Sequence, residues 1–518
     1  MPVHDHGSRP YEWVGAWSER RAALSPDRVG LVDVTTDRTF TYADLDARAN
    51  RTARFLRSAG VADGERVAVV SRNRPEYVDL FFATGKTGGV LAPLSHRLAP
   101  GELVQMLNDV DPSLLVVEEP FESLAEDVLA HGDRAFETDV RSLPTAADGD
   151  PTFAPLADAL PSDESPVESA SLALDDPHLF LHTGGSTGVP KETVITHGAI
   201  YWNSMNTITA WGIRDDDVTP MVFPMFHTGG WNVITVPLFH MGGRVSIARE
   251  FDPGRMLSII ESQGATVFIA VPAMLRMMTE HERWEEADLS SLRFAKSGGG
   301  PSRDPVMRAW WEKGVEFSQG YGLTECGPNN FAMPDDWPHE KADSVGVPGP
   351  HVDVRIVDED GDPVERGEVG ELLLASPHAA DRYWHDEAES AETFDEHVHT
   401  GDLARRDEAG YVYIEGRKKN MFVSGGENVY PPEVENHVSD HPAVDEVVVL
   451  PVADDTWGQV GKAVVEGDES LTIADLTDFL EGRLAKFKWP RHLAFVEEMP
   501  TSGPSKIDRR AVEERFGD

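Results

Sequence analysis

The sequence predicts an α/β fold, with a large N-terminal domain of parallel α/β sheets, a small antiparallel β sub-domain and a small α+β C-terminal domain. Three observations predict this organisation. The chain has 518 residues, which is more than one hydrophobic core usually accommodates. Short apolar segments alternate with segments of helical period through the first third. Between residues 352 and 374, apolar residues instead recur at every second position, which is typical of antiparallel strands.

The first third contains predicted strands and helices in regular succession. Thr41 can cap a helix that carries Leu45, Ala49 and Leu56 on one face, and Gly60 ends it. Beyond this helix, apolar strands alternate with helices: strands at 66–71, 89–93 and 114–118, and helices at 75–85 and 100–108. Strands separated by helices of this length indicate a parallel sheet.

The rest of the chain continues the alternation after an interruption. Residues 139–176 are rich in Pro, Asp, Ala and Ser, which predicts a surface connection. Strand and helix patterns resume at 194–196, 258–263 and 267–271, and a last series follows Pro431, at 433–438, 444–450, 473–484 and 494–496. We therefore predict an N-terminal domain over residues 1–416 and a C-terminal domain over 417–518.

Composition excludes several classes of function. Ninety acidic residues against 46 basic ones give a net charge of −44, which repels nucleic acids and anionic membranes. No apolar run is long enough to span a membrane. The single cysteine, Cys326, excludes an internal disulfide and a Cys-based zinc site. The N-terminus lacks the pattern of a secretory signal, so we expect a cytoplasmic protein.

The acidic residues are spread along the whole chain, and only 11 of the 46 basic residues are lysines. Dispersed acids with arginine preferred over lysine are typical of a protein kept soluble in concentrated salt, because salt screens the self-repulsion. We therefore expect a halophilic protein.

The segment 182–191, His-Thr-Gly-Gly-Ser-Thr-Gly-Val-Pro-Lys, follows a short apolar strand. Its glycines let the backbone bend so that several N–H groups converge on a phosphate. Hydroxyl groups and a lysine add further donors, and the spacing is not that of a Walker loop. The candidate phosphate ligands are Thr183, Gly184, Gly185, Ser186, Thr187, Gly188 and Lys191.

This segment resembles the phosphate-binding loop of the adenylate-forming superfamily, Thr-Ser-Gly-Thr-Thr-Gly-x-Pro-Lys-Gly. The superfamily includes acyl-CoA synthetases, peptide-synthetase adenylation domains and firefly luciferase. Gly184 and Glu192 depart from the usual residues, and Gly184 removes one hydroxyl. Five further segments resemble the family's other motifs in the same order, so the resemblance covers residues 25–510.

The segment 319–325, Gln-Gly-Tyr-Gly-Leu-Thr-Glu, resembles the family's second landmark. The resemblance implies that Tyr321 packs on adenine, Thr324 bonds the α-phosphate and Glu325 binds Mg²⁺. It also implies that Asp402 binds the ribose hydroxyls and that Arg417 reaches ribose or phosphate. The remaining nucleotide-binding residues that it implies are Gly299, Gly300, Pro301, Gln319, Gly320 and Gly322.

Two more segments resemble the moving parts of the family. In this resemblance, Lys419 is the pivot about which a mobile C-terminal domain swings, and Gly425 and Gly426 lie where pantetheine passes. Lys506 is the catalytic lysine that bonds both the substrate carboxylate and the α-phosphate, with Ser505 in place of the usual glycine.

The segment 223–231, Phe-Pro-Met-Phe-His-Thr-Gly-Gly-Trp, resembles the family's acyl-pocket segment. It makes His227 a candidate catalytic or pocket residue, and a structural role for this histidine stays open. Trp231, Asn232 and Val271 are candidate pocket walls, although core packing explains them equally well.

The resemblance implies a fatty-acid–CoA ligase that forms acyl-CoA through an acyl-adenylate, with ATP, Mg²⁺ and coenzyme A. We expect a medium- or long-chain fatty acid, because the segments 226–231 and 271–276 resemble those of fatty and aryl acid ligases more than those of acetate ligases. No acidic residue stands out as a partner for an amino-acid ammonium. The alternatives are an aryl-acid or o-succinylbenzoate CoA ligase, a stand-alone adenylation enzyme, and a catalytically dead nucleotide-binding protein. Its partners would be these small molecules and not nucleic acid. A monomer and a homodimer both remain open.

Overall fold

The computed structural model describes residues 14–61, 63–145, 150–183, 191–424, 427–454, 457–481, 483–502 and 506–517. The chain folds into two compact units. The first contains the described residues up to Trp337 together with Val347–Asp353 and Leu374–Val398. The second contains Pro338–Gly346, Val354–Leu373 and the described residues from His399 onward. The predicted domain boundary after residue 416 remains a prediction.

The first unit contains a six-stranded sheet that is parallel apart from its last strand. Its order is β6(Asp139–Leu143)-β5(Leu114–Glu118)-β3(Arg66–Val70)-β4(Val90–Leu94)-β7(Pro177–Thr183)-β8(Lys191–Thr196). β8 runs antiparallel to β7. The predicted parallel sheet is therefore confirmed, because β3, β4, β5 and β7 all pair in parallel.

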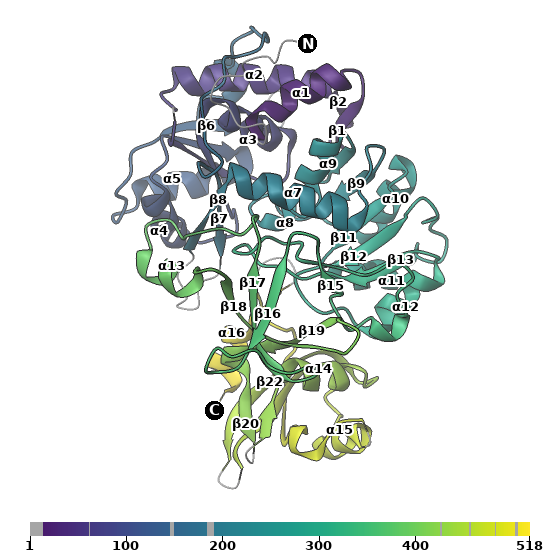
Figure 1. Cartoon of the computed structure of the whole chain (residues 1–518). Helices are drawn as coiled ribbons and strands as arrows, with labels where there is room; N and C mark the ends of the chain where they lie inside the picture. Colours follow the sequence, from purple (N-terminus) through teal and green to yellow (C-terminus); the bar gives the residue numbers. More distant parts are fainter. Residues whose placement is uncertain are drawn as a thin grey trace. The chain divides into compact units, whose positions relative to one another are not determined.

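Helices cover both faces of this sheet because its strands are apolar on both sides. Val67 and Val69 belong to a core shared with α2(Tyr42–Ser58) and α3(Pro75–Thr87), which pack side by side (Figure 1). Ala68 and Val70 face the opposite core, formed with α4(Pro100–Val110) and α5(Glu122–Ala130). Thr41 caps α2 as predicted, since its hydroxyl accepts from the Asp44 N–H.

The interval 139–176 is only partly a surface connection. Asp139–Leu143 forms the edge strand β6, paired with β5 along its whole length. The sequence prediction missed this strand because only Ser142 and Leu143 are buried in it, so an apolar pattern is almost lacking. The predicted helix 473–484 is also too long, since α15 spans Ile473–Leu480.

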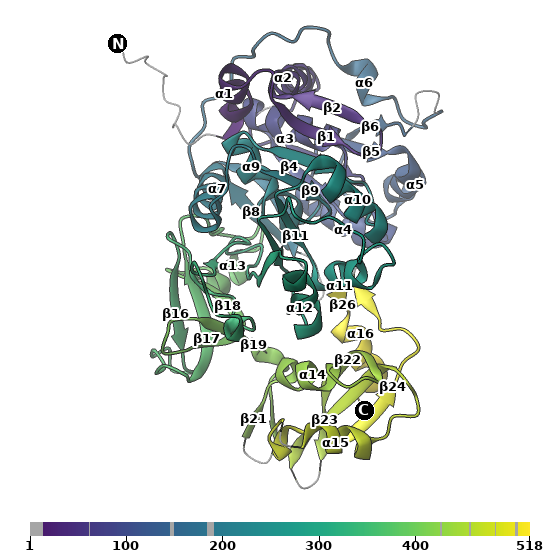
Figure 2. The same cartoon turned by 90° about the vertical axis from the view of Figure 1, so that its right-hand side faces the viewer.

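Two further sheets complete the first unit. One has the order β2(Arg38–Thr41)-β1(Val29–Asp33)-β10(Arg244–Ile247)-β9(Val218–Met221), and the other is the parallel sheet β11(Val267–Ala270)-β12(Phe294–Ser297)-β13(Glu316–Gln319). The helices around them are α1(Trp17–Leu24), α7(His197–Trp211), α9(Thr235–Met241), α10(Pro253–Gln263), α11(Pro272–Glu280) and α12(Asp304–Glu312) (Figure 2). Short helices α6(Leu156–Ala159), α8(Thr228–Trp231) and α13(Glu387–Thr393) and the short strands β14(Phe331–Ala332) and β15(Val347–Pro348) lie in the connections.

The second unit holds two small sheets. The first has the order β16(Asp353–Val357)-β17(Val369–Ala375)-β18(Val398–Arg406)-β19(Val412–Arg417), most of whose residues belong to this unit. The second has the order β21(Glu427–Val429)-β20(Phe422–Ser424)-β23(Gly458–Gly467)-β22(Val444–Asp454), with β24(His492–Phe495) also paired to β23. Around them lie α14(Pro431–Ser439), α15, α16(Arg509–Phe516) and the hairpin β25(Thr501–Ser502)–β26(Lys506–Ile507).

Candidate active site

The phosphate-loop segment is fixed at its two ends. Thr183 ends β7, Lys191 begins β8, and the two residues are paired in register across the two strands. Gly184, Gly185, Ser186, Thr187 and Gly188 lie outside the described residues.

Lys191 lies in a polar setting formed by the segment 380–389. Its Nζ is 2.6 Å from Glu389 Oε1 and 3.9 Å from Asp386 Oδ2. It also lies 5.4 Å from the centre of the Tyr383 ring. The Lys191 side chain is only 11% exposed, so these partners hold its ammonium in one place.

Glu325 is held by the same segment. The Tyr383 hydroxyl donates to Glu325 Oε1 over 2.9 Å, and the Ala380 N–H donates to the Glu325 carbonyl over 2.8 Å. Burial raises the pKa of Tyr383, and the charge of Glu325 raises it further. The phenol therefore stays protonated and serves as the donor.

Glu325 suits a metal that is shared with a nucleotide. Mg²⁺ usually takes one or two protein carboxylates and completes its shell with phosphate oxygens and water. No group of three His, Cys, Asp or Glu side chains that could hold a metal alone occurs in the described ranges. One oriented carboxylate near the loop's lysine fits an ion that arrives with a triphosphate.

The predicted adenine-binding segments lie at the carboxyl ends of neighbouring parallel strands. Ser297 ends β12 and Gln319 ends β13, and the two residues are paired in register. Gln319 Oε1 accepts from the Ser302 N–H over 2.8 Å, which ties the segment of Gly299, Gly300 and Pro301 to that of Gly320, Tyr321 and Gly322. Gly322 is required, because a Cβ there would lie 2.3 Å from the Pro328 backbone.

The predicted ribose residues meet within the second unit. Asp402 on β18 and Arg417 at the end of β19 are paired in register, and Arg417 Nε is 2.7 Å from Asp402 Oδ1. Thr400 Oγ1 accepts from the Asp402 N–H over 3.1 Å and donates to the Leu372 carbonyl over 2.7 Å. The structure thus brings the two predicted ligands together.

The predicted pivot of the second unit, Lys419, is exposed in a 3₁₀ turn over Lys418–Asn420. Gly425 and Gly426, the predicted border of the pantetheine path, lie outside the described residues. The backbone of Lys506 begins β26, and its side chain lies outside the described part of the chain.

The segment that carries His227 is a tightly folded loop. The Met225 N–H donates to Asn73 Oδ1 over 2.8 Å, while the Met225 carbonyl accepts from Trp231 Nε1 over 2.6 Å. Asn73 Nδ2 donates to the Phe223 carbonyl over 2.9 Å. A Cβ on Gly230 would lie 2.6 Å from the Pro224 carbonyl oxygen, so only glycine permits this approach. Asn73 thus joins the end of β3 to the acyl segment.

His227 lies among aromatic rings. The His227 ring centre is 5.5 Å from that of His182 and 4.6 Å from that of Phe226. Burial lowers the pKa of His182 to about 3, so this ring is neutral near pH 7. The surroundings of His227 therefore include flat, uncharged rings.

The three candidate pocket walls differ in their surroundings. Trp231 is fully buried and stacks on Phe81 at 4.8 Å. Asn232 is 3% exposed, and its Nδ2 donates to Thr228 Oγ1 over 3.3 Å. Val271 precedes α11, with its Cγ1 3.7 Å from where a Cβ on Gly299 would lie. The pocket role of all three stays a prediction.

Sequence reasoning missed several residues of this region. Asn329 Nδ2 donates to Thr207 Oγ1 and to the Val233 carbonyl, both over 2.7 Å, and joins the segment after Glu325 to the acyl segment. Tyr383 and Glu389 were also missed. None of these residues lies in a motif of fixed spacing, so only their long-range partners reveal them.

Glu192, the residue after Lys191, is buried at 2% exposure. Neither of its carboxylate oxygens has a hydrogen-bond partner among the described residues. Burial, with a smaller contribution from the nearby Asp109, raises the pKa of Glu192 to about 8. The carboxyl group is therefore largely protonated at neutral pH.

Family models match the chain in two places. The model of the AMP-binding enzyme matches residues 18–384, and the model of the AMP-binding enzyme C-terminal domain matches residues 433–506.

No helix of the described part is long and apolar enough to cross a membrane.

Relatives resemble the chain over nearly its whole length. A feruloyl-CoA synthase from an Amycolatopsis species is 37% identical over 97% of this chain and 99% of its own. An indoleacetate–CoA ligase from Aromatoleum aromaticum is 34% identical over 96% of each chain. A long-chain-fatty-acid–CoA ligase from Mycobacterium tuberculosis is 31% identical over 97% and 98%.

Solved structures agree with this similarity. The anthranilate CoA ligase AuaEII in complex with anthranoyl-AMP has a TM-score of 0.89 at 26% identity, over 99% of both chains. ATP-bound MatB from Rhodopseudomonas palustris has a TM-score of 0.87 at 29% identity, over 98% and 99%. The motifs, the fold and these matches agree, and the chain belongs to the AMP-binding enzyme family, the adenylate-forming superfamily that its sequence motifs resemble.

Proposed function

We propose that the chain is an ATP-dependent carboxylic acid:CoA ligase that releases AMP and pyrophosphate. The observation that carries this proposal is the arrangement of Lys191, Tyr383 and Glu325. It holds an ammonium and a carboxylate beside the ends of a glycine-rich loop. A triphosphate with its counter-ion needs both kinds of charge.

The reaction has two steps. A carboxylate oxygen of the acid attacks the α-phosphorus of ATP, an acyl–phosphate bond forms, and pyrophosphate leaves. The CoA sulfur then attacks the acyl carbonyl, its proton passes to solvent, and AMP leaves. Since AMP is a good leaving group, the second step needs no strong general base.

The residues divide these tasks. Lys191 and the loop amides neutralise phosphate charge, and Thr324 bonds the α-phosphate. Glu325 would hold Mg²⁺, which supplies further charge neutralisation when bound. Tyr321 supports adenine, and the paired Asp402 and Arg417 bind ribose.

Motion of the C-terminal part separates the two steps. Lys506 bonds the carboxylate and α-phosphate in the first step and withdraws when the chain turns at Lys419. Gly425 and Gly426 then border the path of pantetheine. This is a gating use of domain motion.

We propose an aromatic carboxylic acid as the substrate. The relatives at 37% and 34% identity are named for ferulate and indoleacetate, and the rings of His182 and Phe226 beside His227 offer flat contact surfaces. A fatty acid, which the sequence motifs favoured, is the second candidate, supported by the fatty-acid ligase at 31% identity.

The test is AMP release with ferulate, indoleacetate, palmitate and acetate, each with and without CoA. The assay contains Mg²⁺ and molar KCl, because the acid-rich composition favours a halophilic protein. We expect CoA-dependent turnover to be fastest with an aromatic acid. Turnover with palmitate alone would favour the second candidate. Acid-dependent pyrophosphate exchange without CoA turnover would indicate another acceptor of the acyl group. No activity with any of the acids would overturn the proposal.

A further inference from the structure

The segment that joins Lys191 to Glu325 is fixed by backbone hydrogen bonds at both ends. The Val194 N–H donates to the Arg382 carbonyl over 3.2 Å, and the Trp384 N–H donates to the Glu192 carbonyl over 2.8 Å. Tyr383 therefore lies against the free edge of β8, opposite Thr193. Together with the bond from Ala380 to Glu325, these contacts tie the phosphate loop's second end to the glutamate segment.

Tyr383 contacts both charged residues with different parts of one side chain. Its hydroxyl donates to the Glu325 carboxylate over 2.9 Å, and its ring faces the Lys191 ammonium at 5.4 Å. The residue is 7% exposed, and its ring packs against Phe394 with centres 5.1 Å apart. Its rotamer is therefore fixed by packing, which a residue that orients others requires.

Two other buried tyrosines of the first unit bond to backbone carbonyls and not to a carboxylate. A buried phenol needs one hydrogen-bond acceptor, and backbone carbonyls usually serve. Tyr42 donates to the Gly243 carbonyl over 2.6 Å, and Tyr77 lies 3.3 Å from the Ser71 carbonyl. Both are fully buried in the same unit. Tyr383 instead donates to the carboxylate that the family resemblance assigns to Mg²⁺.

We propose that Tyr383 is a positioning residue for nucleotide binding. Its hydroxyl orients the Glu325 carboxylate toward the metal that accompanies ATP, and its ring, together with Glu389, keeps the Lys191 ammonium in place for the phosphates. The inference rests on the proposed function in taking ATP as the ligand, but it requires neither acid nor CoA.

The test compares ATP binding with Mg²⁺ and with EDTA, measured by calorimetry in molar KCl. In Tyr383→Phe, which removes only the hydroxyl, we expect the Kd for ATP with Mg²⁺ to rise about tenfold, as for the loss of a hydrogen bond to a charged group. The Kd with EDTA should stay unchanged. Tyr383→Leu also removes the ring, so both Kd values should rise.

Tyr42→Phe is the matched control, because it loses a buried hydroxyl bond of similar length far along the chain. It should leave both Kd values unchanged. An unchanged Mg²⁺ Kd in Tyr383→Phe, or equal shifts with Mg²⁺ and EDTA, would overturn the proposal. Thermal melts of all three variants show whether they are folded.

A double-mutant cycle with Glu325→Gln gives an independent readout. If the hydroxyl acts through Glu325, Tyr383→Phe should have little further effect on Mg²⁺-dependent binding once Glu325 is changed. Additive effects would contradict the assignment. A wild-type protein that binds ATP with Mg²⁺ but turns over no acid would overturn the proposed function while leaving this inference standing.

Discussion

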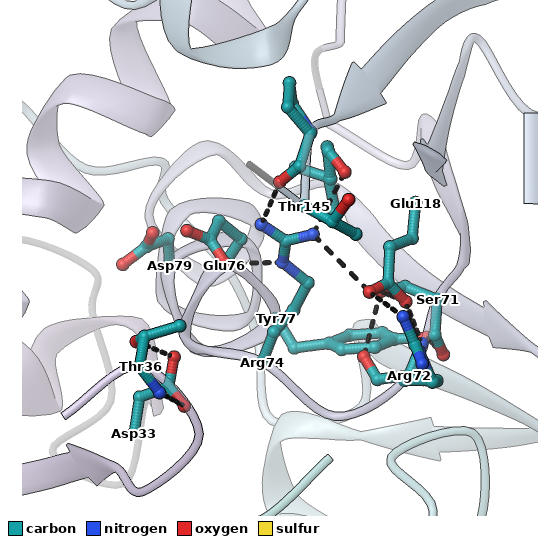
Figure 3. Close-up of polar contacts among 12 residues, drawn as sticks. Asp33, Thr36, Ser71, Arg72, Arg74, Glu76, Tyr77, Asp79, Glu118 and Thr145 are labelled. Carbon is teal, nitrogen blue, oxygen red and sulfur yellow. Dashed lines mark hydrogen bonds and ion pairs between the residues drawn. The ribbon is translucent and has the colours of Figure 1, made fainter. Parts of the chain in front are cut away.

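Two polar clusters of the first unit use charged side chains in opposite ways. The closed cluster consists of Arg72, Arg74, Glu76 and Glu118 (Figure 3). Its Glu118 carboxylate is fully buried and accepts from the Arg72 N–H over 2.9 Å and from Arg72 Nη2 over 3.0 Å. Arg74 Nη1 donates to the Leu143 carbonyl over 3.1 Å, and its Nε is 2.7 Å from Glu76. The open cluster consists of Lys191, Glu325, Tyr383 and Glu389. Lys191 and Glu325 contact different parts of the Tyr383 side chain.

The two clusters differ in how their carboxylates are neutralised. Burial alone would raise the pKa of Glu76, but Arg74, Arg48 and Arg38 lower it to about 2. Burial also acts to raise the pKa of Glu118, but hydrogen bonds from Arg72 outweigh it and lower that pKa. The closed cluster neutralises its own charges and stabilises the fold. In the open cluster Lys191 is paired with Glu389, but the Glu325 carboxylate accepts from the Tyr383 hydroxyl, a neutral partner that does not cancel its charge.

The largest expected contrast comes from changing a carboxylate in the open cluster. Glu325→Gln keeps the side chain's shape but removes its charge, so we expect acid-dependent pyrophosphate exchange to fall about 10²- to 10³-fold, as for the loss of one transition-state ligand. The melting temperature should change little. A large loss of stability with normal exchange by the folded fraction would show that Glu325 stabilises the fold and does not serve nucleotide binding.

The matched change in the closed cluster should lower the free energy of unfolding and leave the activity of the folded protein unchanged. Glu118→Gln leaves Arg72 without its buried partner, and we expect the free energy of unfolding to fall by about 3 kcal/mol. Urea unfolding in molar KCl measures this quantity. The exchange activity of the folded protein should stay near wild type, and an activity loss without a stability loss would contradict the structural assignment.

Asn329 gives a third test, because its side chain joins the segment after Glu325 to Thr207 and Val233. Asn329→Ala should raise the KM for the acid about tenfold, about the effect of one lost hydrogen bond of 1.4 kcal/mol, with a smaller change in the KM for ATP. Asn50→Ala is the control, because Asn50 is equally buried and bonds Asp46 and Glu164 elsewhere. Both variants should lose stability, and equal acid KM values in the two would contradict the positioning role.

Glu192 belongs to neither cluster, and its effect is expected in the pH dependence of stability rather than in activity. Its pKa is raised from 4.5 to about 8, so the folded state binds the extra proton. Stability from this group is present below pH 4.5 and is lost as pH rises toward 8, by at most about 1.4 kcal/mol per pH unit. Glu192→Gln should remove this slope. Unfolding curves between pH 5 and 9 measure it, and parallel pH profiles of variant and wild type would contradict the raised pKa.

The sequence predicted the parallel sheet and the family because those features have local signatures. Apolar strands between helices and motifs of fixed spacing can be read within about ten residues. The contact of Gln319 with Ser302 was not predicted, and the structure explains it, because β12 and β13 are neighbouring parallel strands whose carboxyl ends share one edge.

Other features could not be predicted because they depend on distant pairings. Tyr383 and Glu325 are 58 positions apart, and nothing in Arg-Tyr-Trp at 382–384 distinguishes that tyrosine from a core residue. β6 was missed because its few buried residues give no apolar pattern. The burial of Glu192 was equally hidden, since glutamate side chains are seldom fully buried.

The most direct test of the proposed chemistry separates its two steps with Lys506→Ala. We expect this variant to lose acyl-adenylate formation from acid and ATP by several orders of magnitude, because the lysine neutralises charge only in that step. It should still convert a supplied acyl-adenylate and CoA to acyl-CoA at nearly the wild-type rate. Equal loss of both half-reactions would contradict the assignment of Lys506 and the separation of the two steps.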